Sequence, residues 1–243
     1  MALDGAPNPE SKRLLVPGVQ APNRMSPGIV QSLRPQARPQ IQGIQGPLPK
    51  IFLAIPNMGT VATELMMTVL RWVTSGRYQI TVYPPMFFSP VAYARNHCAE
   101  AFLKSEFDYL FFVDSDTVPP VETLDRLLQP RVKAIIGVTR TMKTDETTGV
   151  MSPVPMVMKR IKEGLTHYQG KGVEQVDSGG LSCTLLHRDV FTNMNLPYFD
   201  HGVWDGDDLI GEDFRFFAEM TAHGVPLFAN FDVVCKHWKS VPI

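Results

Sequence analysis

The chain has 243 residues, 44% of them hydrophobic, and a formal net charge of −1 at pH 7. A chain of this length and composition can bury a substantial core, so we expect one domain of roughly 190 residues plus a tail. The near-neutral charge provides no strong nucleic-acid signature and no sign of a surface for anionic membranes. No apolar run approaches the ~18 residues of a transmembrane segment, and the N-terminus lacks the apolar core of a signal peptide, so we expect a cytoplasmic protein.

Residues 1–49 differ in composition from the rest of the chain. They contain 9 of the 21 prolines and no aromatic residue, and their five basic and two acidic side chains give a net charge of +3. Such a segment buries too little apolar surface to offset the entropy lost on ordering. We therefore predict a Pro/Gln-rich, extended or disordered arm at 1–49, a candidate tether for a protein partner, ahead of a globular domain at 50–243.

Between residues 51 and 138, apolar runs alternate with segments of helical periodicity. Strands are expected at Ile51–Ile55, Tyr78–Tyr83, Tyr109–Val113 and Val132–Val138, with helices at Val61–Ser75, Pro90–Leu103 and Val121–Leu128. Ser89 and Pro90 are expected as the N-cap and first residue of the second helix. The alternating order predicts an α/β fold, in which a Rossmann-like, mostly parallel central sheet carries helices on both faces.

The second half of the chain is less regular and predicts a smaller mixed β region. Short strands are expected at Pro155–Lys159, Leu165–Gln169, Val173–Val176, Leu181–Leu186, Pro226–Phe231 and Val233–Cys235. A short helix is expected at Arg188–Met194 and a longer one at Glu212–His223, which Gly224 ends. The polar, glycine-rich loop Tyr198–Leu209 precedes the longer helix.

The strand Tyr109–Val113 runs directly into Asp114, Ser115 and Asp116. In α/β sheets, ligands bind outside the carboxyl ends of the strands, where the loop Pro56–Gly59 is also expected. Two carboxylates held close together repel each other, and a divalent cation with oxygen ligands relieves that repulsion. The same residues also suit a turn carboxylate followed by a helix N-cap, so this motif alone leaves both interpretations open.

Two further groups of polar residues accompany this motif. Arg95 borders the buried stripe of its helix, where a guanidinium needs an anionic partner such as Asp114 or a phosphate. Glu212 and Asp213 open a later helix, and His237 follows the next apolar strands. Taken alone, acidic residues in the first turn of a helix complement its dipole, and a half-buried histidine is an ordinary structural residue.

In this order, the motifs resemble those of the GT-A glycosyltransferases, most closely the large family-2 group. Those chains typically have an apolar strand followed by Pro, an Ala-Arg-Asn helix, an apolar strand ending in Asp-x-Asp (the DXD motif), a glycine-rich strand pair, a Glu-Asp helix start and a late His. The matching residues are Ile51–Pro56, Ala94–Asn96, Val113–Asp116, Ser178–Leu186, Glu212-Asp213 and His237. The resemblance covers about residues 50–240 and implies a GT-A fold. The loop Asn57–Thr60 departs from the family because it lacks the aromatic-Asn pair, and the short chain suggests a compact enzyme of viral, phage or otherwise streamlined type.

The resemblance implies a metal-dependent site for a nucleotide-sugar donor. Asp114, Asp116 and His237 would hold Mn²⁺ or Mg²⁺, which would neutralise the departing nucleoside diphosphate. An imidazole ligand favours Mn²⁺, and Asp114 would alternatively contact the ribose. The residues expected to bind the nucleotide-sugar are Pro56, Asn57, Arg95, Asp114, Ser115, Gly179 and Gly180. The two glycines also suit a simple hairpin turn.

The resemblance also implies roles on the acceptor side. Asp213 matches the general base that removes the proton of the acceptor hydroxyl in inverting members, and Glu212 is the second candidate. In a retaining enzyme, Asp213 would instead bind the acceptor. Trp204 and Asp205 are candidates for contacts with the unknown acceptor, since an aromatic ring beside carboxylates is typical of sugar subsites. A solvated acidic loop explains these two residues equally well.

These expectations predict a glycosyltransferase of the EC 2.4 type that moves a sugar from a nucleotide-diphosphate sugar to an acceptor hydroxyl. One alternative is a sugar nucleotidyltransferase, which releases pyrophosphate and would have a longer glycine-rich basic loop than Gly59-Thr60 provides. The other is a non-catalytic interaction protein that docks through its Pro-rich arm. The expected location is the cytoplasm, or the host cytoplasm for a viral protein.

Overall fold

The computed structural model describes residues 47–238, apart from residues 146, 163, 201–202 and 206–207. These residues belong to one compact unit, Gly46–Ile243. The predicted arm at 1–49 lies outside the described residues except for its last three positions. Within the described part of the chain, no helix is long and apolar enough to cross a membrane.

A seven-stranded sheet forms the centre of this unit, with the strand order β10-β15-β5-β12-β3-β1-β2. In chain order, the strands are β1 (Lys50–Ala54), β2 (Gln79–Tyr83), β3 (Tyr109–Val113), β5 (Ala134–Val138), β10 (Val173–Val176), β12 (Cys183–His187) and β15 (Leu227–Val234). β1 is parallel to β2 and β3, and β15 is parallel to β5, whereas β12 runs antiparallel to β3 and β5, and β10 runs antiparallel to β15. Because β12 is antiparallel to both of its neighbours, five strands share one direction, which confirms the predicted mostly parallel sheet.

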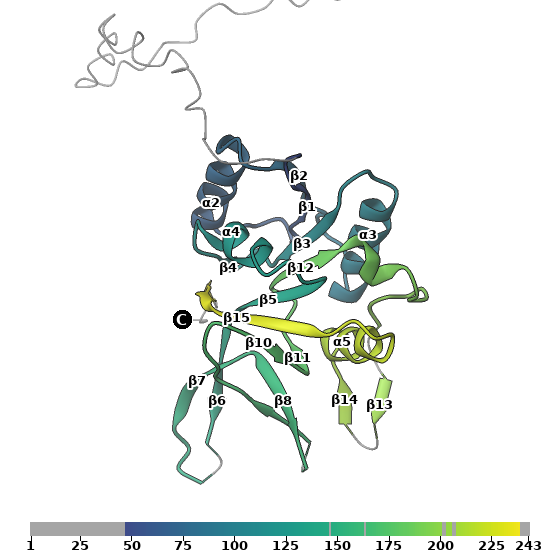
Figure 1. The fold of residues 1–243 in the computed structure, drawn as a ribbon. Helices are drawn as coiled ribbons and strands as arrows, with labels where there is room; N and C mark the ends of the chain where they lie inside the picture. Colours follow the sequence, from purple (N-terminus) through teal and green to yellow (C-terminus); the bar gives the residue numbers. More distant parts are fainter. Residues whose placement is uncertain (1–46, 146, 163, 201–202, 206–207, 239–243) are drawn as a thin grey trace, which may run out of the picture. The chain divides into compact units, whose positions relative to one another are not determined.

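Helices cover both faces of the sheet, as the sequence predicts. They are α2 (Thr63–Thr74), α3 (Val91–Leu103), α4 (Thr123–Leu128) and α5 (Glu212–Ala222). Figure 1 shows α2 and α4 on one side of the strands and α3 and α5 on the other. Successive residues of a strand point to opposite faces, so Phe111 packs in the buried cluster that contains Leu65 of α2, while Phe112 packs in the cluster that contains Phe102 of α3. Both rings are fully buried, which explains the uninterrupted apolar run of β3.

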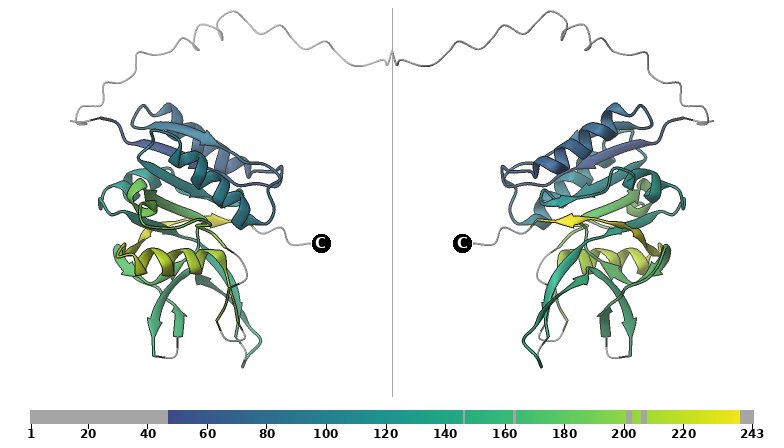
Figure 2. Two further views of the ribbon diagram at one scale, coloured as in Figure 1. Left: turned by 90° about the vertical axis from the view of Figure 1, so that its right-hand side faces the viewer. Right: turned by 90° about the vertical axis from the view of Figure 1, so that its left-hand side faces the viewer.

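The smaller mixed β region is also present in the second half of the chain. β6 (Arg140–Thr144) and β7 (Met151–Pro155) form a hairpin, and β8 (Val157–Ile161) lies between β9 (Gly164–His167) and β11 (Ser178–Gly179). Figures 1 and 2 show β6, β7 and β8 extending away from the central sheet. The β6–β7 hairpin was not predicted because most of its side chains are exposed, so burial imposes no alternating apolar pattern on its sequence.

The predicted start of α3 is wrong by one residue. Pro90, not Ser89, occupies the N-cap, with an extended backbone (φ −71°, ψ 170°). Its carbonyl oxygen accepts hydrogen bonds from the amides of Tyr93 and Ala94 at 3.0 and 3.4 Å, and the N-cap makes no side-chain hydrogen bond. The helix therefore begins without the side-chain cap that a serine would provide.

Two predicted boundaries in the second half of the chain also differ from the structure. The strands predicted at Pro226–Phe231 and Val233–Cys235 form the single strand β15, because a register shift relative to β5 absorbs the irregularity between them. The helix predicted at Arg188–Met194 is one 3₁₀ turn, η1 (Arg188–Phe191).

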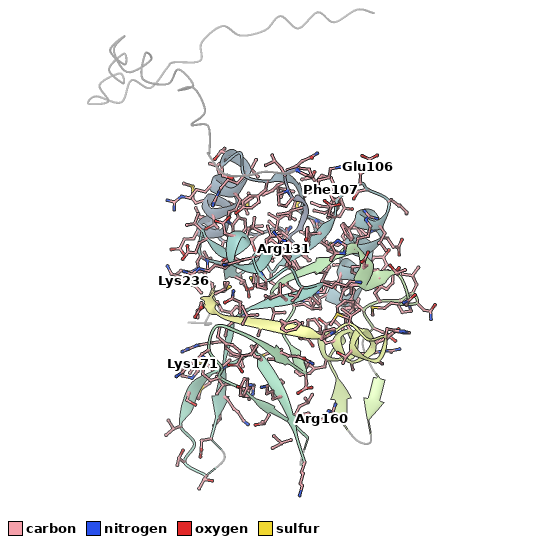
Figure 3. All side chains as sticks on the ribbon, viewed as in Figure 1. Glu106, Phe107, Arg131, Arg160, Lys171 and Lys236 are labelled. Carbon is pink, nitrogen blue, oxygen red and sulfur yellow. The ribbon has the colours of Figure 1, made fainter. Side chains whose placement is uncertain are left out.

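Arg188, the first residue of η1, closes the C-terminal end of α3. Its guanidinium donates hydrogen bonds of 2.6–3.2 Å to the carbonyl oxygens of Phe102, Leu103, Ser105 and Phe107. It also lies 4.7 Å from the centre of the Phe102 ring; Phe107 is labelled in Figure 3. The last carbonyls of a helix have no partners within the helix, so a side chain that bonds several of them stabilises that end.

We expect Arg188→Met to lower the free energy of unfolding by about 3 kcal/mol, because it leaves several partly buried carbonyl groups without donors. Chemical denaturation measures the change. Arg126→Met is the matched control: the Arg126 side chain is 42% exposed, forms an ion pair with Glu122 at 3.7 Å and donates one hydrogen bond of 3.3 Å to the carbonyl of Asp232, so its loss is expected to cost less than about 1 kcal/mol. Equal losses in the two variants would contradict the role of Arg188.

Candidate functional site

Three loops meet at the carboxyl ends of β1, β2 and β3. The loop after β1 pairs with the loop after β2, since the amide of Asn57 donates to the carbonyl of Pro85 at 3.1 Å and the amide of Phe87 donates to the carbonyl of Asn57 at 2.9 Å. The amide of Ala62 donates to the carbonyl of Ser115 at 2.8 Å, which joins the loop after β1 to the segment after β3. The polar segments that the sequence predicts at this edge are therefore neighbours in space.

Two cavities adjoin at this edge, and Asp114 lines both. The first, the loop cavity, has a volume of about 380 Å³ and is lined by the three loops, including Pro56, Asn57, Ser115 and Asp116. The second, the carboxylate cavity, has a volume of about 180 Å³, and its polar lining residues are Arg95, Asp114, Thr139, Thr141, Ser182, Glu212, Asp213 and His237. Each predicted catalytic or metal-binding side chain lines one of these two cavities.

The side chain of Asn57 forms hydrogen bonds with the backbone of its own loop and of the loop after β2. Its Nδ2 donates to the carbonyl of Ile55 at 3.0 Å and to that of Pro85 at 3.4 Å, and its Oδ1 accepts from the amide of Gly59 at 3.0 Å. The residue is 7% exposed. Asn57 therefore shapes the wall of the loop cavity, and no local sequence pattern predicts these hydrogen bonds.

Sequence reasoning missed the aromatic part of this wall. Phe88 lines the loop cavity, and its ring stacks on that of His97 with 4.6 Å between centroids and 20° between planes. Phe87 has a φ of 63°, which is uncommon for an aromatic residue, and a Cβ built on Gly59 would lie 2.8 Å from its ring. Gly59 itself has a φ of 96°, so this close approach requires glycine. The apolar triplet Met86–Phe88, directly after a Pro-Pro turn, is the signal in the sequence.

Arg95 of α3 links two carboxylates across the carboxylate cavity. It is 4% exposed, and its Nη2 lies 3.2 and 3.3 Å from the two carboxylate oxygens of Asp114, while its Nη1 donates to Glu212. Burial acts to lower the pKa of Arg95, but the charges of Asp114, Glu212 and Asp213 outweigh it and raise that pKa. The carboxylate of Asp114 is therefore directed toward the guanidinium of Arg95.

Glu212 and Asp213 are adjacent in sequence but differ in environment. Glu212 is 8% exposed and ion-paired with Arg95. Asp213 accepts a hydrogen bond from the amide of Phe214 at 2.9 Å. Burial, reinforced by the charge of Glu212 and opposed by that of Arg95, raises the pKa of Asp213 to about 6. Of the two predicted catalytic carboxylates, Asp213 has the pKa of a base that works near neutral pH.

His237 is held against Asp116 by a short strand pair. β16 (Lys236–His237) runs antiparallel to β4 (Thr117–Val118), and Lys236 is labelled in Figure 3. The amide of Trp238 also donates to the carbonyl of Asp116 at 2.8 Å. The His237 Nδ1 lies 3.0 Å from the carbonyl oxygen of Arg140, which can only accept, so Nδ1 carries the proton. In the neutral ring, Nε2 then presents a lone pair beside Asp116, whose Oδ2 is 3.3 Å away.

The three predicted metal ligands are thus divided into a pair and a single residue. Asp116 and His237 lie together, whereas Asp114 turns to Arg95. In the described part of the chain, no group of three or more His, Cys, Asp or Glu side chains is arranged to hold a metal ion. Among the described residues, one carboxylate and one imidazole therefore lie together at this point.

The two predicted glycines have different surroundings. A Cβ at Gly179 would lie 2.3 Å from Cδ1 of Ile136, so Gly179 allows β11 to pack closely on the sheet. Gly180 lines the carboxylate cavity, and a Cβ there would meet no atom closer than 3.6 Å. Trp204 and Asp205 belong to β13 (Val203–Asp205), which pairs with β14 (Asp208–Ile210), but their side chains lie outside the described part of the structure.

Two hydroxyl groups in the carboxylate cavity also escaped prediction. Thr139 follows β5 and Ser182 precedes β12, and their hydroxyl oxygens are 2.9 Å apart. Both residues are more than nine-tenths buried, at 3% and 8% exposed. Ser182 lies within the matched segment Ser178–Leu186, but Thr139 belongs to no motif, and the topology of the sheet, not their sequence spacing, brings the two hydroxyl groups together.

Comparisons with known proteins gave matches only among solved structures: no family model matches the chain, and no curated protein matches it. The structure of A197 from STIV has a TM-score of 0.51 and 19% sequence identity, over 79% of this chain and 86% of that one. GalNAc-T7, solved with UDP, GalNAc and Mn²⁺, has a TM-score of 0.49 and 11% identity, over 79% of this chain and 44% of that one. TarS 1–349 from S. aureus has a TM-score of 0.42 and 15% identity, over 77% of this chain and 60% of that one. At 19% identity, the likeness to A197 concerns the fold alone, and this fold is the GT-A fold that the sequence predicts.

Proposed function

Because the chain has the GT-A fold, we propose that it is a metal-dependent glycosyltransferase, which moves a sugar from a nucleotide-diphosphate sugar to an acceptor hydroxyl. The observation that carries the proposal is the carboxylate cavity. Asp213, whose pKa burial raises to about 6, lies there with the ion-paired Asp114 and with His237, which contacts Asp116. A base poised near neutral pH beside a site for charged phosphates is what glycosyl transfer to a hydroxyl requires.

The two adjoining cavities suit the two halves of such a donor. In this proposal, the nucleoside lies in the loop cavity of about 380 Å³ and the sugar in the carboxylate cavity of about 180 Å³. The diphosphate that joins them would lie near Ser115 and Asp116, where the cavities meet at Asp114. We further propose Trp204 and Asp205 as contacts for the acceptor.

The residues at this edge fit a divalent cation whose coordination the donor's diphosphate completes. Asp116 provides a carboxylate oxygen 3.3 Å from the Nε2 of His237. The carbonyl of Arg140 orients the imidazole through Nδ1, which is the usual arrangement behind a histidine ligand. Carboxylate and phosphate oxygens suit Mg²⁺ and Mn²⁺, and the imidazole favours Mn²⁺. Such an ion would supply charge neutralisation for the departing nucleoside diphosphate.

The residues of the chain supply the proton transfer and hold the geometry. Asp213 accepts the proton of the acceptor hydroxyl, and the acceptor oxygen forms a bond to the anomeric carbon as the bond from that carbon to the diphosphate oxygen breaks. The bonding electron pair leaves with the nucleoside diphosphate. In this single displacement, the acceptor oxygen attacks from the side opposite the leaving group, so one base suffices and the anomeric centre is inverted. Arg95 forms ion pairs with the carboxylates of both Asp114 and Glu212 and so holds them in place.

Release of nucleoside diphosphate from a panel of nucleotide-sugars, with Mn²⁺ present and water as the acceptor, tests the proposal. A sugar nucleotidyltransferase would instead release pyrophosphate from a nucleoside triphosphate and a sugar phosphate. A chain that releases neither product and binds no nucleotide-sugar would be a non-catalytic protein, which would contradict the proposal.

We expect Asp116→Ala to lower the rate of nucleoside diphosphate release at least 100-fold, because it removes the carboxylate that the proposal assigns to the cation. The assay is the release of nucleoside diphosphate as a function of Mn²⁺ concentration. Asp232→Ala, which removes an exposed carboxylate from β15, is the control and is expected to keep the wild-type rate. Full turnover in Asp116→Ala would show that the metal assignment is wrong.

A further inference from the structure

The charged groups of the carboxylate cavity include more acids than available cations. Three carboxylates, those of Asp114, Glu212 and Asp213, line it together with a single guanidinium, that of Arg95. No lysine lines it. If the proposed function holds and the donor sugar occupies this cavity, the sugar therefore meets an excess of negative charge.

Neither cationic side chain of the cavity is available to a bound anion. Arg95 bonds Glu212 through Nη1 and Asp114 through Nη2, and its Nε, which has no hydrogen-bond partner among the described residues, is buried from solvent. The Nδ1 of His237 is directed to the carbonyl of Arg140, and its Nε2 faces Asp116. A carboxylate on the donor sugar would thus be buried beside Asp213 with no cationic side chain of the described residues free to pair with it, while the proposed divalent cation would be engaged by Asp116, His237 and the diphosphate, which is unfavourable.

The hydroxyl groups of Thr139 and Ser182 can form hydrogen bonds with an uncharged sugar. The two oxygens share one proton across 2.9 Å, which leaves the second proton and further lone pairs for another hydrogen bond. Met156 and Leu181 line the same cavity, and Met156, which is only partly buried, provides an apolar neighbour for the C–H face of a pyranose ring. Buried hydroxyls beside apolar side chains suit a neutral sugar that carries hydroxyl groups.

We propose that the carboxylate cavity selects a neutral donor sugar against a sugar acid, and that Thr139 and Ser182 are the residues that hold its hydroxyl groups. The inference rests on the proposed function and narrows its substrate class. Selection against the acid comes from the unpaired carboxylate of Asp213, and affinity for the neutral sugar comes from the hydroxyl pair.

Isothermal titration of the full chain in the presence of Mn²⁺ tests the proposal. The probes are two matched series, UDP with UDP-glucose and UDP-glucuronic acid, and GDP with GDP-mannose and GDP-mannuronic acid. Within the series whose nucleoside diphosphate binds, we expect the neutral conjugate to bind at least about 30-fold more tightly than the acid. Equal affinities, or tighter binding of the acid, would overturn the inference while leaving a donor site in place. Failure of both UDP and GDP to bind would instead overturn the proposed function, and the inference with it.

Variants separate the two parts of the inference. Thr139→Val keeps the shape of the side chain and removes its hydroxyl, so we expect the neutral conjugate to bind about 5- to 10-fold more weakly and the nucleoside diphosphate alone to bind unchanged. Thr166→Val, at an exposed position of β9, is the control and is expected to change neither affinity. Asp213→Asn should reduce the preference for the neutral conjugate at least about tenfold. A Thr139→Val variant that weakens both ligands equally, or an unchanged preference in Asp213→Asn, would contradict the assigned roles.

Discussion

Asp213→Asn is expected to lower kcat/KM for glycosyl transfer about 10³-fold while the protein remains folded. Asparagine keeps the size of the side chain but cannot accept the proton of the acceptor hydroxyl, and general base catalysis contributes about 10²- to 10⁴-fold. Nucleoside diphosphate release measures the loss. Glu219→Gln, which removes a carboxylate elsewhere on α5, is the control and should retain the wild-type kcat/KM.

The pH dependence of the wild type provides a second test of the same base. Burial raises the pKa of Asp213 to about 6, so kcat/KM is expected to rise with pH up to about 6 and then to level off. Below that pKa, the base is protonated and activity should fall about tenfold per pH unit. An Asp213→Asn variant that retains most of the activity, or a wild-type profile that is flat from pH 5 to 8, would assign the base elsewhere.

The raised pKa of Asp213 also predicts that the free energy of unfolding falls as pH rises, whereas kcat/KM rises. A carboxyl group whose folded-state pKa lies above its unfolded value stabilises the fold fully below the unfolded value of 3.8 and loses that stabilisation as pH rises through about 6. At pH 7.5, the charged Asp213 therefore opposes folding. Since one pKa unit corresponds to about 1.4 kcal/mol, the difference between 3.8 and about 6 predicts that Asp213→Asn raises the free energy of unfolding at pH 7.5 by about 3 kcal/mol, as measured by chemical denaturation.

Arg95→Met is expected to lower the free energy of unfolding by about 3 to 5 kcal/mol. The guanidinium is 4% exposed and bonds both Asp114 and Glu212, so its removal leaves two carboxylates in the cavity without their counter-charge. Donor affinity should fall at least about tenfold, because Asp114 loses the contact that orients it. Arg95→Lys should restore little of this, since an ammonium cannot reproduce the two-sided contact of the planar guanidinium.

A double variant tests whether the three residues act as one network. Arg95→Met with Glu212→Gln removes one of the two carboxylate charges that Arg95 contacts, so we expect the double variant to be more stable than Arg95→Met alone. Glu212→Gln by itself should be destabilising, because Arg95 then loses a charged partner. Strictly additive changes in the free energy of unfolding would contradict the network, since coupled residues depart from additivity by about 0.5 to 3 kcal/mol.

The sheet could be predicted from the sequence because burial on both faces imposes a strong pattern. The strands β3 and β10 have the predicted bounds, and β1 and β2 differ by one residue at their ends. Each of these strands except β10 is a continuous run of mostly apolar residues ended by charged residues or prolines. The β6–β7 hairpin lacks such a pattern because water, and not a packed layer, surrounds most of its side chains.

The site could be predicted as a set of residues but not as a set of contacts. The spacing of Asp114 and Asp116 suggests a shared ligand, yet the two carboxylates meet different partners, Arg95 and His237. The tautomer of His237 depends on the carbonyl of Arg140, almost one hundred residues away in the chain. Such pairings follow from how β4 and β16 are brought together, and no local sequence pattern encodes them.

The proposed function depends most directly on the binding of a nucleotide-sugar, together with a divalent cation, at the edge of the sheet where Asp116 and His237 lie. A ligand that binds only the folded state raises the melting temperature by mass action, so thermal unfolding with a panel of nucleotide-sugars, each with and without Mn²⁺, measures this binding. We predict that at least one nucleotide-sugar raises the melting temperature with Mn²⁺ and has little effect without it, and that His237→Ala abolishes the Mn²⁺-dependent part. No shift with any donor, or an equal shift with and without Mn²⁺, would contradict the account.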